Sequence, residues 1–179
     1  STVEKMYAPK GTILVRQHSH NPYTYIIASG IARGFRHVHG EDITVSLWAE
    51  TQVLSDVTTY IANNPAVKSY ELIEDSQLYR VNNAKFRALF AFDHEICNLG
   101  RLLAEDYIMR MEATKRLYQG LDAHQKYQAF LSEKPGLVYR VKSKHIASYL
   151  NITPEIFCRI HSDALKNKII KTPLEIEWP

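Results

Sequence analysis

The sequence predicts an α+β protein with a β-rich N-terminal half, one long helix and a pair of short C-terminal helices. Three observations lead to this prediction. Strand-like runs recur up to about residue 90, the apolar spacing then changes to three and four residues, and residues 143–168 contain the start and turn signals of two short helices.

The N-terminal half contains short runs rich in β-branched and aromatic residues. Turn signals such as Lys10-Gly11, Ser29-Gly30 and His39-Gly40 separate the runs. We expect strands at residues 12–16, 23–27, 31–36, 41–48, 69–73 and 77–81. Short strands at this spacing are typical of a β-sandwich or a jelly-roll barrel.

A short helix is expected at residues 83–90 and a long one from Asp93 to about Gly120. The long helix has an apolar stripe at three- and four-residue spacing that includes Ile96, Leu99, Leu103, Tyr107 and Met111. The stripe is explained either by packing on the barrel or by pairing with a second copy of the chain. Leu102, Ile108 and Met109 widen the apolar surface, which favours contacts on two sides.

After Gly120 the pattern predicts a helix at residues 123–132, capped by Asp122 and with Tyr127, Phe130 and Leu131 facing inward. Residues 137–141 are rich in Val and Tyr and predict a strand. We expect residues 169–171 to pair with that strand as a reduced wing. Residues 172–179 are expected to be a tail, to which we assign no role.

Residues 143–168 predict two helices joined by a sharp turn. Ser143 stands where the N-cap of a first helix, 144–150, is expected. Asn151 tolerates the left-handed backbone that such a corner needs. Thr153 can cap the second helix and Pro154 suits its first position. The inward face of the second helix is expected to consist of Ile156, Ile160 and Leu165.

This pattern is typical of a helix-turn-helix, whose second helix lies in the DNA major groove. Glu155 and Arg159 are four residues apart and so project from the same face of the helix. An arginine can bond to guanine through two hydrogen bonds, and a glutamate can accept one from cytosine N4. The alternative interpretation is a helical hairpin of an ordinary bundle, with Glu155 and Arg159 as a surface ion pair.

The charge distribution agrees with contacts to nucleic acid, although a merely solvated face would look the same. The net charge of +3 is only mildly basic. Residues 134–171, however, include many basic side chains and only two acids, Glu155 and Asp163. The basic residues of this span are Lys134, Arg140, Lys142, Lys144, Arg159, Lys166, Lys168 and Lys171. A locally basic end is what phosphate contacts require.

The run DAHQKYQAFLSEKPGLVYRVKSKHIASYLNITPEIFCRI resembles the C-terminal part of Crp/Fnr-type (cyclic-AMP receptor protein) transcriptional regulators, and IASYLNITPE resembles the form common in Bacteroidetes. The N-terminal K-G-T-I-L, A-S-G-I-A-R-G and H-G-E-D-I-T-V resemble the family's barrel. The resemblance implies a cyclic-nucleotide-binding-like jelly-roll (double-stranded β-helix) barrel at residues 1–91. It also implies a dimerisation helix at 92–120, which includes the stripe described above, and a winged helix-turn-helix at 121–179.

The resemblance also implies partners and residue roles. The partners are double-stranded DNA with a palindromic operator, a second copy of the chain, and RNA polymerase. Glu155 and Arg159 match the family's base-reading positions. A further basic base-reading position matches Pro154, so that contact is lost, and the family's turn glycine is Asn151. The residues expected to contact phosphates are Ser143, Lys144, Thr153, Ser162 and Lys166.

The effector pocket of the family is predicted to be degenerate in this chain. Alignment on Asp56 and on residues 74–76 places Ser55 at the family's phosphate-cradling glycine and Val67 at its phosphate-binding arginine. Valine cannot neutralise a buried phosphate. Lys68 is adjacent, but on a strand it would point to the opposite face from Val67. We therefore expect no response to cyclic AMP.

Two further alternatives remain at this stage. The pairs His18/His20 and His37/His39 could assemble a metal site from neighbouring loops. His37 and His39 also resemble the H-x-H motif of cupin enzymes, but Glu41 follows too closely for that pattern. This alternative is a metal-binding or small-molecule-binding barrel enzyme with a helical dimerisation tail. The third interpretation is a regulator that has no effector and responds to a protein partner or is constitutive.

We predict no catalytic residue, metal or cofactor. Cys97 and Cys158 cannot supply the four thiolates that an iron–sulfur cluster typically needs. A reduced, cytoplasmic protein is expected from the two distant cysteines. The first residues do not form a signal peptide, and no apolar run is long enough to cross a membrane.

Overall fold

The structure is a computed structural model that describes residues 2–166, apart from the side chains of residues 117 and 118. The chain forms two compact units, of which the first ends at Ala113 and the second begins at Thr114. The three-part division expected from the sequence, with boundaries after residues 91 and 120, stays a prediction.

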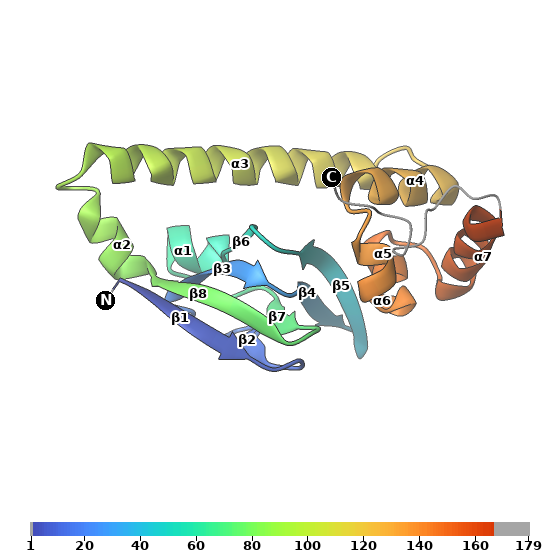
Figure 1. Ribbon diagram of the computed structural model, residues 1–179, viewed down its shortest axis with the longest axis horizontal. Helices are drawn as coiled ribbons and strands as arrows, with labels where there is room; N and C mark the ends of the chain where they lie inside the picture. The colour runs from blue at the N-terminus through green and yellow to red at the C-terminus, as the bar shows by residue number, and fades with distance from the viewer. Residues whose placement is uncertain (1, 167–179) are drawn as a thin grey trace, which may run out of the picture. The chain divides into compact units, whose positions relative to one another are not determined.

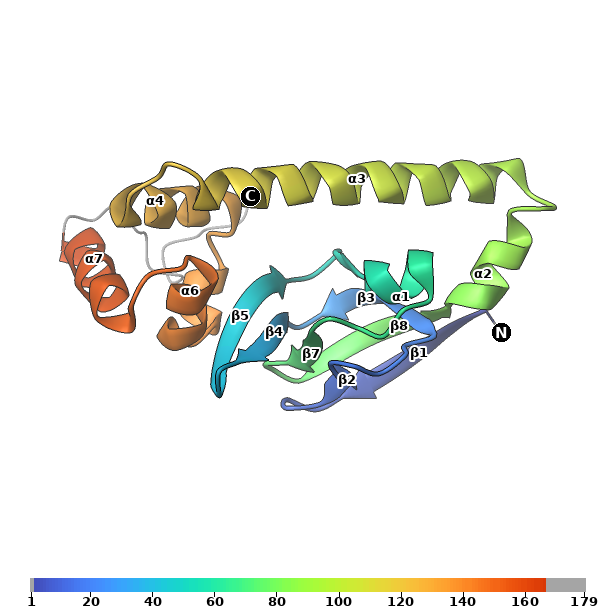
Figure 2. The same ribbon diagram turned by 180° about the vertical axis from the view of Figure 1, so that it is seen from behind.

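The first unit contains two four-stranded antiparallel sheets (Figures 1 and 2). One sheet has the order β1-β8-β3-β6 and the other the order β2-β7-β4-β5. The strands are β1 (Val3–Ala8), β2 (Ile13–Val15), β3 (Tyr23–Ser29), β4 (Ala32–Val38), β5 (Glu41–Trp48), β6 (Val53–Leu54), β7 (Ser69–Leu72) and β8 (Ser76–Asn82). Sheet neighbours such as β1 and β8 are far apart in sequence, as in a jelly-roll barrel.

One helix of the first unit lies between two strands, and the other two come after the last strand. The short α1 (Val57–Ala62) lies between β6 and β7, and α2 (Asn83–Leu89) follows β8. The long helix α3 (His94–Tyr118) starts in the first unit and continues past Ala113. Asp56 caps α1 by accepting a hydrogen bond from the backbone N–H of Thr59.

The six strands predicted in the N-terminal half are all present, and β5 has the expected bounds. Strands β1 and β6 were not expected. Four of the six residues of β1 are exposed, because it lies at the edge of its sheet, so the strand has little of the apolar alternation that marks a half-buried strand. Strand β6 has only two residues, too few to show a period.

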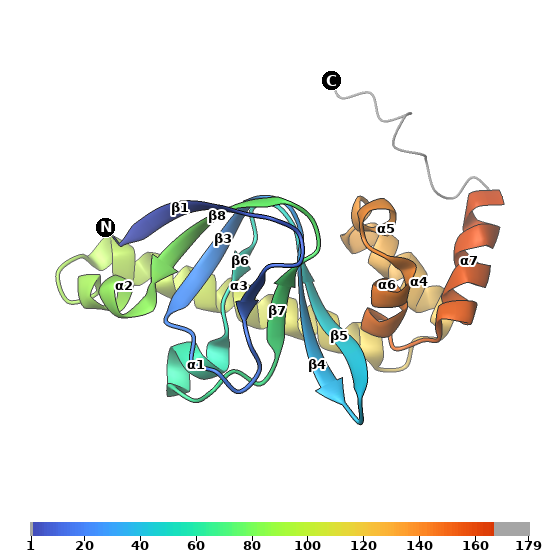
Figure 3. The ribbon, with the colours of Figure 1, turned by 90° about the horizontal axis from the view of Figure 1, so that it is seen from below.

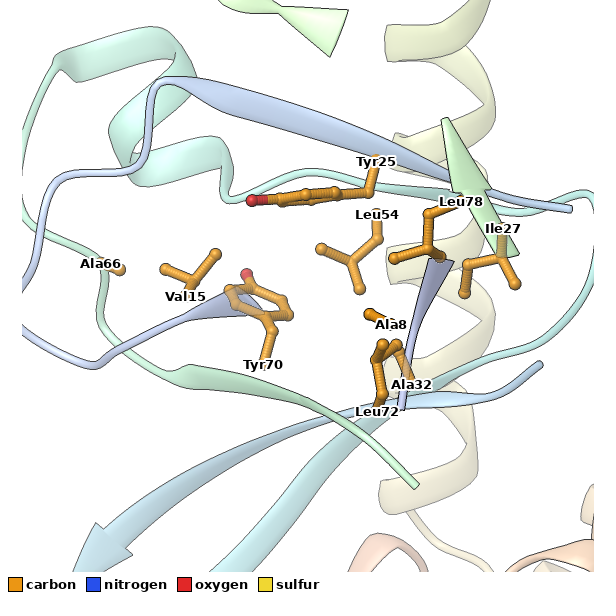
Figure 4. Close-up of a cluster of buried hydrophobic side chains, with 10 residues drawn as sticks. All are labelled: Ala8, Val15, Tyr25, Ile27, Ala32, Leu54, Ala66, Tyr70, Leu72 and Leu78. Carbon is orange, nitrogen blue, oxygen red and sulfur yellow. The ribbon is translucent and has the colours of Figure 1, made fainter. Parts of the chain in front are cut away.

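The core of this unit lies between the two sheets, where side chains from both point toward one another (Figure 4). Ile27, Leu78 and Leu54 come from β3, β8 and β6 of one sheet, and Leu72 and Tyr70 come from β7 of the other. All five are at most 1% exposed. Full burial of an aliphatic or aromatic side chain of this size stabilises a fold by about 1.5–3 kcal/mol.

One turn of the barrel depends on a glycine. Gly30, between β3 and β4, has a φ of +111°, and a Cβ placed there would lie 2.0 Å from Ser76 Oγ. Ser76 is the first residue of β8, so the turn packs directly against the next strand of the sheet. Only a residue without a side chain allows this close approach.

The second unit is helical, with α4 (Ala123–Glu133), α5 (Leu137–Arg140), α6 (Ser143–Tyr149) and α7 (Pro154–Lys166) (Figure 3). Helix α4 was predicted, and Asp122 and Gln125 form a capping box at its start. Tyr127 and Phe130 of α4 are fully buried, as expected, whereas Leu131 is half-buried.

The strand predicted at residues 137–141 is wrong, because this segment forms the helical turn α5. The N–H of Val141 donates to the carbonyl of Leu137 at 2.9 Å. Leu137 and Val138 are neighbours in sequence and are both buried, which a helical turn allows but the alternation of a strand does not. The predicted wing partner, residues 169–171, and the tail 172–179 lie outside the described residues.

None of the described helices, including the 25-residue α3, combines the length and apolar character that a membrane crossing requires.

Candidate functional site

Helices α6 and α7 pack against each other around a sharp turn. Asn151 has the predicted left-handed backbone, with a φ of 53°. The N–H of Ile152 donates to the carbonyl of Ala147 at 3.0 Å, which closes the end of α6. Helix α7 begins at Pro154, and Thr153 Oγ1 accepts from the N–H of Ile156 at 3.3 Å. The expected two-helix corner and its second cap are therefore present.

The buried face of this helix pair differs in part from the expectation. Ile160 is buried as predicted, Ile156 is half-buried, and Leu165 is 41% exposed. The residues of α7 that instead fill the core are Phe157 and Ala164. Phe157 packs its ring against Tyr127 of α4, so the buried stripe of α7 consists of Phe157, Ile160 and Ala164.

Helix α4 holds α7 through an aromatic cluster. Tyr127 of α4 lies edge-on to Phe157, with ring centroids 5.6 Å apart, and Phe157 stacks on His161 at the same distance. The Tyr127 hydroxyl is 2.7 Å from His161 Nδ1. Burial lowers the pKa of His161 and raises the pKa of Tyr127 to about 12. Both side chains are therefore neutral at pH 7, and the hydroxyl and the imidazole share one hydrogen bond.

The residues predicted to contact DNA all lie on the exposed side of this helix pair. They are Ser143, Lys144, Thr153, Glu155, Arg159, Ser162 and Lys166. Ser143 is the first residue of α6 and not its cap, because the helix starts one residue earlier than expected. The hydrogen bonds from its own backbone amide and from Thr153 lower the pKa of Glu155, which keeps that carboxylate charged.

The barrel interior contains a polar cluster at the predicted effector position. Asp56 is 2% exposed, and each of its oxygens is occupied. Oδ1 accepts from the N–H of Thr59 at 2.9 Å, and Oδ2 accepts from the hydroxyl of Tyr70 at 2.9 Å. Burial and the Asp56 carboxylate raise the pKa of Tyr70, so its hydroxyl stays a donor.

Lys68 was expected to point away from the effector position, but its side chain packs inward. Val67 is 49% exposed, whereas Lys68 is half-buried. Lys68 Nζ donates to Ser46 Oγ at 3.0 Å and lies 5.4 Å from the ring centroid of Trp48. Burial lowers the pKa of Lys68, and the Asp56 carboxylate opposes this shift. Lys68 and Val67 do point to opposite sides, but Lys68 takes the inward one.

Ser55, which matches the family's phosphate-cradling glycine, is half-buried beside β3. Its hydroxyl oxygen is 3.0 Å from Thr24 Oγ1. Thr24 Oγ1 in turn donates to Asn83 Oδ1 at 2.9 Å. The Ser55 hydroxyl therefore takes part in a hydrogen-bonded chain that links the start of α1 to the start of α2.

The stripe predicted on α3 divides into two sets. Ile96, Leu103 and Tyr107 are half-buried along one side of the helix. This side of α3 faces the polar cluster of the barrel, because burial and the Asp56 carboxylate raise the pKa of Tyr107. Leu99 and Met111 are 47% and 56% exposed. The neighbouring exposed apolar residues are Leu102, Ile108 and Met109.

The paired histidines lie at or near turns. His18 and His39 have positive φ angles of 66° and 52°, and His37 packs its ring edge-on to Phe35. Among residues 2–166, no three His, Cys, Asp or Glu side chains are grouped so that they could hold a metal ion. Cys97 and Cys158 are both exposed free thiols.

Comparison with known proteins finds a family match for the first unit and structural matches for most of the chain. Residues 5–93 match the family model of the cyclic nucleotide-binding domain. No curated protein sequence matches the chain. The resemblance to Crp/Fnr-type regulators that the sequence shows is confirmed at the level of this domain and of the fold.

Solved structures of transcription regulators have the same fold. FixK2 from Bradyrhizobium japonicum matches with a TM-score of 0.83 at 15% identity, covering 97% of this chain and 89% of that one. A CooA mutant from Carboxydothermus hydrogenoformans matches with a TM-score of 0.69 at 14% identity, covering 96% and 80%. The c-di-GMP-responsive global regulator CLP from Xanthomonas campestris matches at 0.66 and 12% identity, covering 96% and 90%. At such identities the likeness shows the fold alone.

The contact between Tyr127 and His161 predicts a pH dependence for α7. Because the folded state lowers the pKa of His161 below its ordinary value of 6.5, folding favours the neutral ring. Stability should therefore be lost as the pH falls below 6.5 toward the folded-state pKa. We expect the protection factors of the Phe157 and Ile160 amides, corrected for the slower intrinsic exchange at lower pH, to fall over that range, and His161→Phe to flatten the dependence. An equally steep dependence in the variant would assign it to another group.

Proposed function

We propose that this chain, whose residues 5–93 belong to the cyclic nucleotide-binding domain family and whose fold is that of Crp/Fnr-type regulators, is a sequence-specific DNA-binding transcription regulator. The observation that supports this function best is the exposed polar face of α7. That face follows a sharp turn and is backed by a buried aromatic contact with α4. The second helix of a DNA-binding helix-turn-helix has this arrangement.

The roles within the face follow from charge and position. Glu155 and Arg159 project from one side of the first two turns of α7, where a recognition helix meets base edges. Arg159 donates to guanine, and Glu155 accepts from cytosine. The remaining positions bind the phosphate backbone and so set the register of the helix: Ser143, Lys144, Thr153, Ser162 and Lys166.

The protein acts as a homodimer through α3. Leu99, Leu102 and Met109 recur at three- and seven-residue spacing and are 47%, 47% and 69% exposed. A second copy of α3 would remove this apolar face from water, while Ile96, Leu103 and Tyr107 remain on the barrel side. A two-fold dimer presents two recognition helices about 34 Å apart, which is one turn of duplex DNA.

The regulator does not respond to cyclic AMP. Residues 55–68 include no arginine, so this segment offers no planar fork for a cyclic phosphate. Lys68 is the inward cation, and a lysine is a point charge without that geometry. Asp56 is 2% exposed and both of its oxygens already accept hydrogen bonds from the protein, so this carboxylate is committed to the fold and not presented to a ligand.

Arg159→Ala should lose about 1–3 kcal/mol of discrimination at one base position, because one bidentate contact is removed. Selection of a palindromic site from pooled genomic DNA, followed by binding titrations against single-base variants, measures this loss. Lys144→Ala is the matched contrast. It should weaken all sites alike and lower the salt slope by about one. If Arg159→Ala retains the wild-type base preferences, the base-reading role is wrong.

Replacing Leu102 and Met109 together by glutamate should convert the dimer to a monomer, because the paired helices would bury four like charges. Sedimentation equilibrium of the full chain measures the mass directly. Ala104→Glu is the control, since Ala104 is exposed on the opposite side of α3. A dimer that survives the double substitution, or one that Ala104→Glu abolishes equally, would exclude this interface.

Calorimetric titration of the full chain with cyclic AMP should show no saturable heat. The DNA selection above is run on the same sample, so that an inactive preparation is recognised. Stoichiometric binding of cyclic AMP would show that Lys68 replaces the family's arginine after all.

A further inference from the structure

The first unit has a hollow between α1, α2 and the segment that enters β3. Its volume is about 530 Å³, within the range of small-molecule sites. Tyr60 and Asn63 line it from α1 and its end, Arg87 from α2, and His20 from the β2–β3 connection. None of the residues described for the effector position, namely Ser55, Asp56, Val67, Lys68 and Tyr70, lines it.

Arg87 is held in this hollow by stacking. Its guanidinium carbon lies 4.4 Å from the centroid of the Tyr60 ring. The guanidinium forms no hydrogen bond or ion pair with any residue between 2 and 166. Stacking fixes the plane of the guanidinium and leaves the N–H groups at its edge free for an acceptor.

The other polar groups around Arg87 are also donors. Asn83 Oδ1 accepts from the hydroxyl of Thr24, and its amide N–H groups can donate to a ligand. His20 and Asn63 add further donors, and their side chains have no hydrogen-bond partner in the part of the chain that is described. No Asp or Glu lines the hollow. A fixed cation, an excess of donors and the absence of carboxylates from the lining together select an oxyanion.

We propose that this hollow binds a small phosphomonoester, with the edge of Arg87 holding the phosphate and His20, Asn63 and Asn83 as supporting donors. Arginine binds phosphate oxygens through two parallel hydrogen bonds, which a stacked guanidinium is already oriented to form. The apolar rest of the ligand takes the remaining volume beside Pro22 and Ala84. The site uses the outer side of α1, whereas Asp56 and Tyr70 belong to the barrel interior.

The position of the hollow also gives it a route to α3. Arg87 is on α2, which is joined to α3 by residues 90–93 only. The N–H of Asp93 donates to the carbonyl of Leu89, so the two helices are connected by a hydrogen-bonded turn. A ligand that immobilises Arg87 would therefore order the segment from which α3 starts.

The test is a two-dimensional ¹H–¹⁵N NMR titration of the full chain with inorganic phosphate and phenyl phosphate, at constant ionic strength maintained with chloride. We expect saturable shifts at His20, Asn63, Asn83 and Arg87, with phenyl phosphate binding more tightly than inorganic phosphate. Benzoate separates phosphate from carboxylate recognition and should bind more weakly. Tighter binding of benzoate, or shifts that chloride reproduces, would overturn the assignment.

Substitutions test which side chains contribute to the binding of phenyl phosphate. Arg87→Ala should weaken phenyl phosphate about tenfold or more, because a charge-assisted pair of hydrogen bonds is lost. Arg87→Lys retains the charge but not the fork and should be intermediate. Tyr60→Leu should weaken binding by about two- to fivefold through loss of the stacking platform. Arg36→Ala, an exposed arginine of β4, is the control and should bind like the wild type.

The backbone spectrum of each variant shows whether it is folded, so a lost ligand is distinguished from a lost structure. Unchanged binding by folded Arg87→Ala would exclude the site. Because the titration contains no DNA, its outcome is independent of whether α7 reads an operator.

Discussion

The register of β7 is the constraint on which the barrel interior depends. Tyr70 pairs with Gly34 of β4 and with Val15 of β2, so strand alternation turns Tyr70 and Leu72 inward together, and Lys68 just before the strand also packs inward. The Tyr70 hydroxyl then reaches Asp56, which caps α1 through its other oxygen. One buried carboxylate thus ties a sheet to the helix that follows β6. A slip of one residue in β7 would expose Tyr70 and leave Asp56 Oδ2 without its donor, at a cost of about 1–3 kcal/mol for the unpaired oxygen.

In the second unit, helix α7 buries one face and exposes the other. Tyr127 and Phe130 of α4 are fully buried, and Tyr127 contacts both Phe157 and His161 of α7. Every turn of α7 up to His161 is therefore anchored from behind. The polar residues that remain outside do not contribute to this core, so they are available for the DNA contacts proposed above. This separation of packing from recognition is what a helix-turn-helix requires.

The errors of the sequence predictions have specific physical causes. At residues 137–141, β-branched and aromatic residues suggested a strand, but the helical turn buries Leu137 and Val138 side by side. Val67 and Lys68 were predicted to face opposite sides, but Val67 was expected to be the inward one, because a lysine that faces inward contradicts the usual pattern. Only the hydroxyl of Ser46 and the rings of Trp48 and Tyr70, from residues up to 22 positions away, make that orientation acceptable. The hollow around Arg87 left no signal in the sequence, because its lining comes from separate segments.

The sequence by itself determined the features that depend on neighbouring residues. The Asn151 corner, the start of α7 at Pro154, the cap at Asp122 and the strand bounds of β5 follow from local backbone preferences and short-range periodicity. The tertiary structure alone decided the phase of β7, the helical turn at Leu137 and the stacking of Arg87 on Tyr60. In each of these, contacts between segments distant in the chain outweigh preferences that differ by only about 1 kcal/mol per residue.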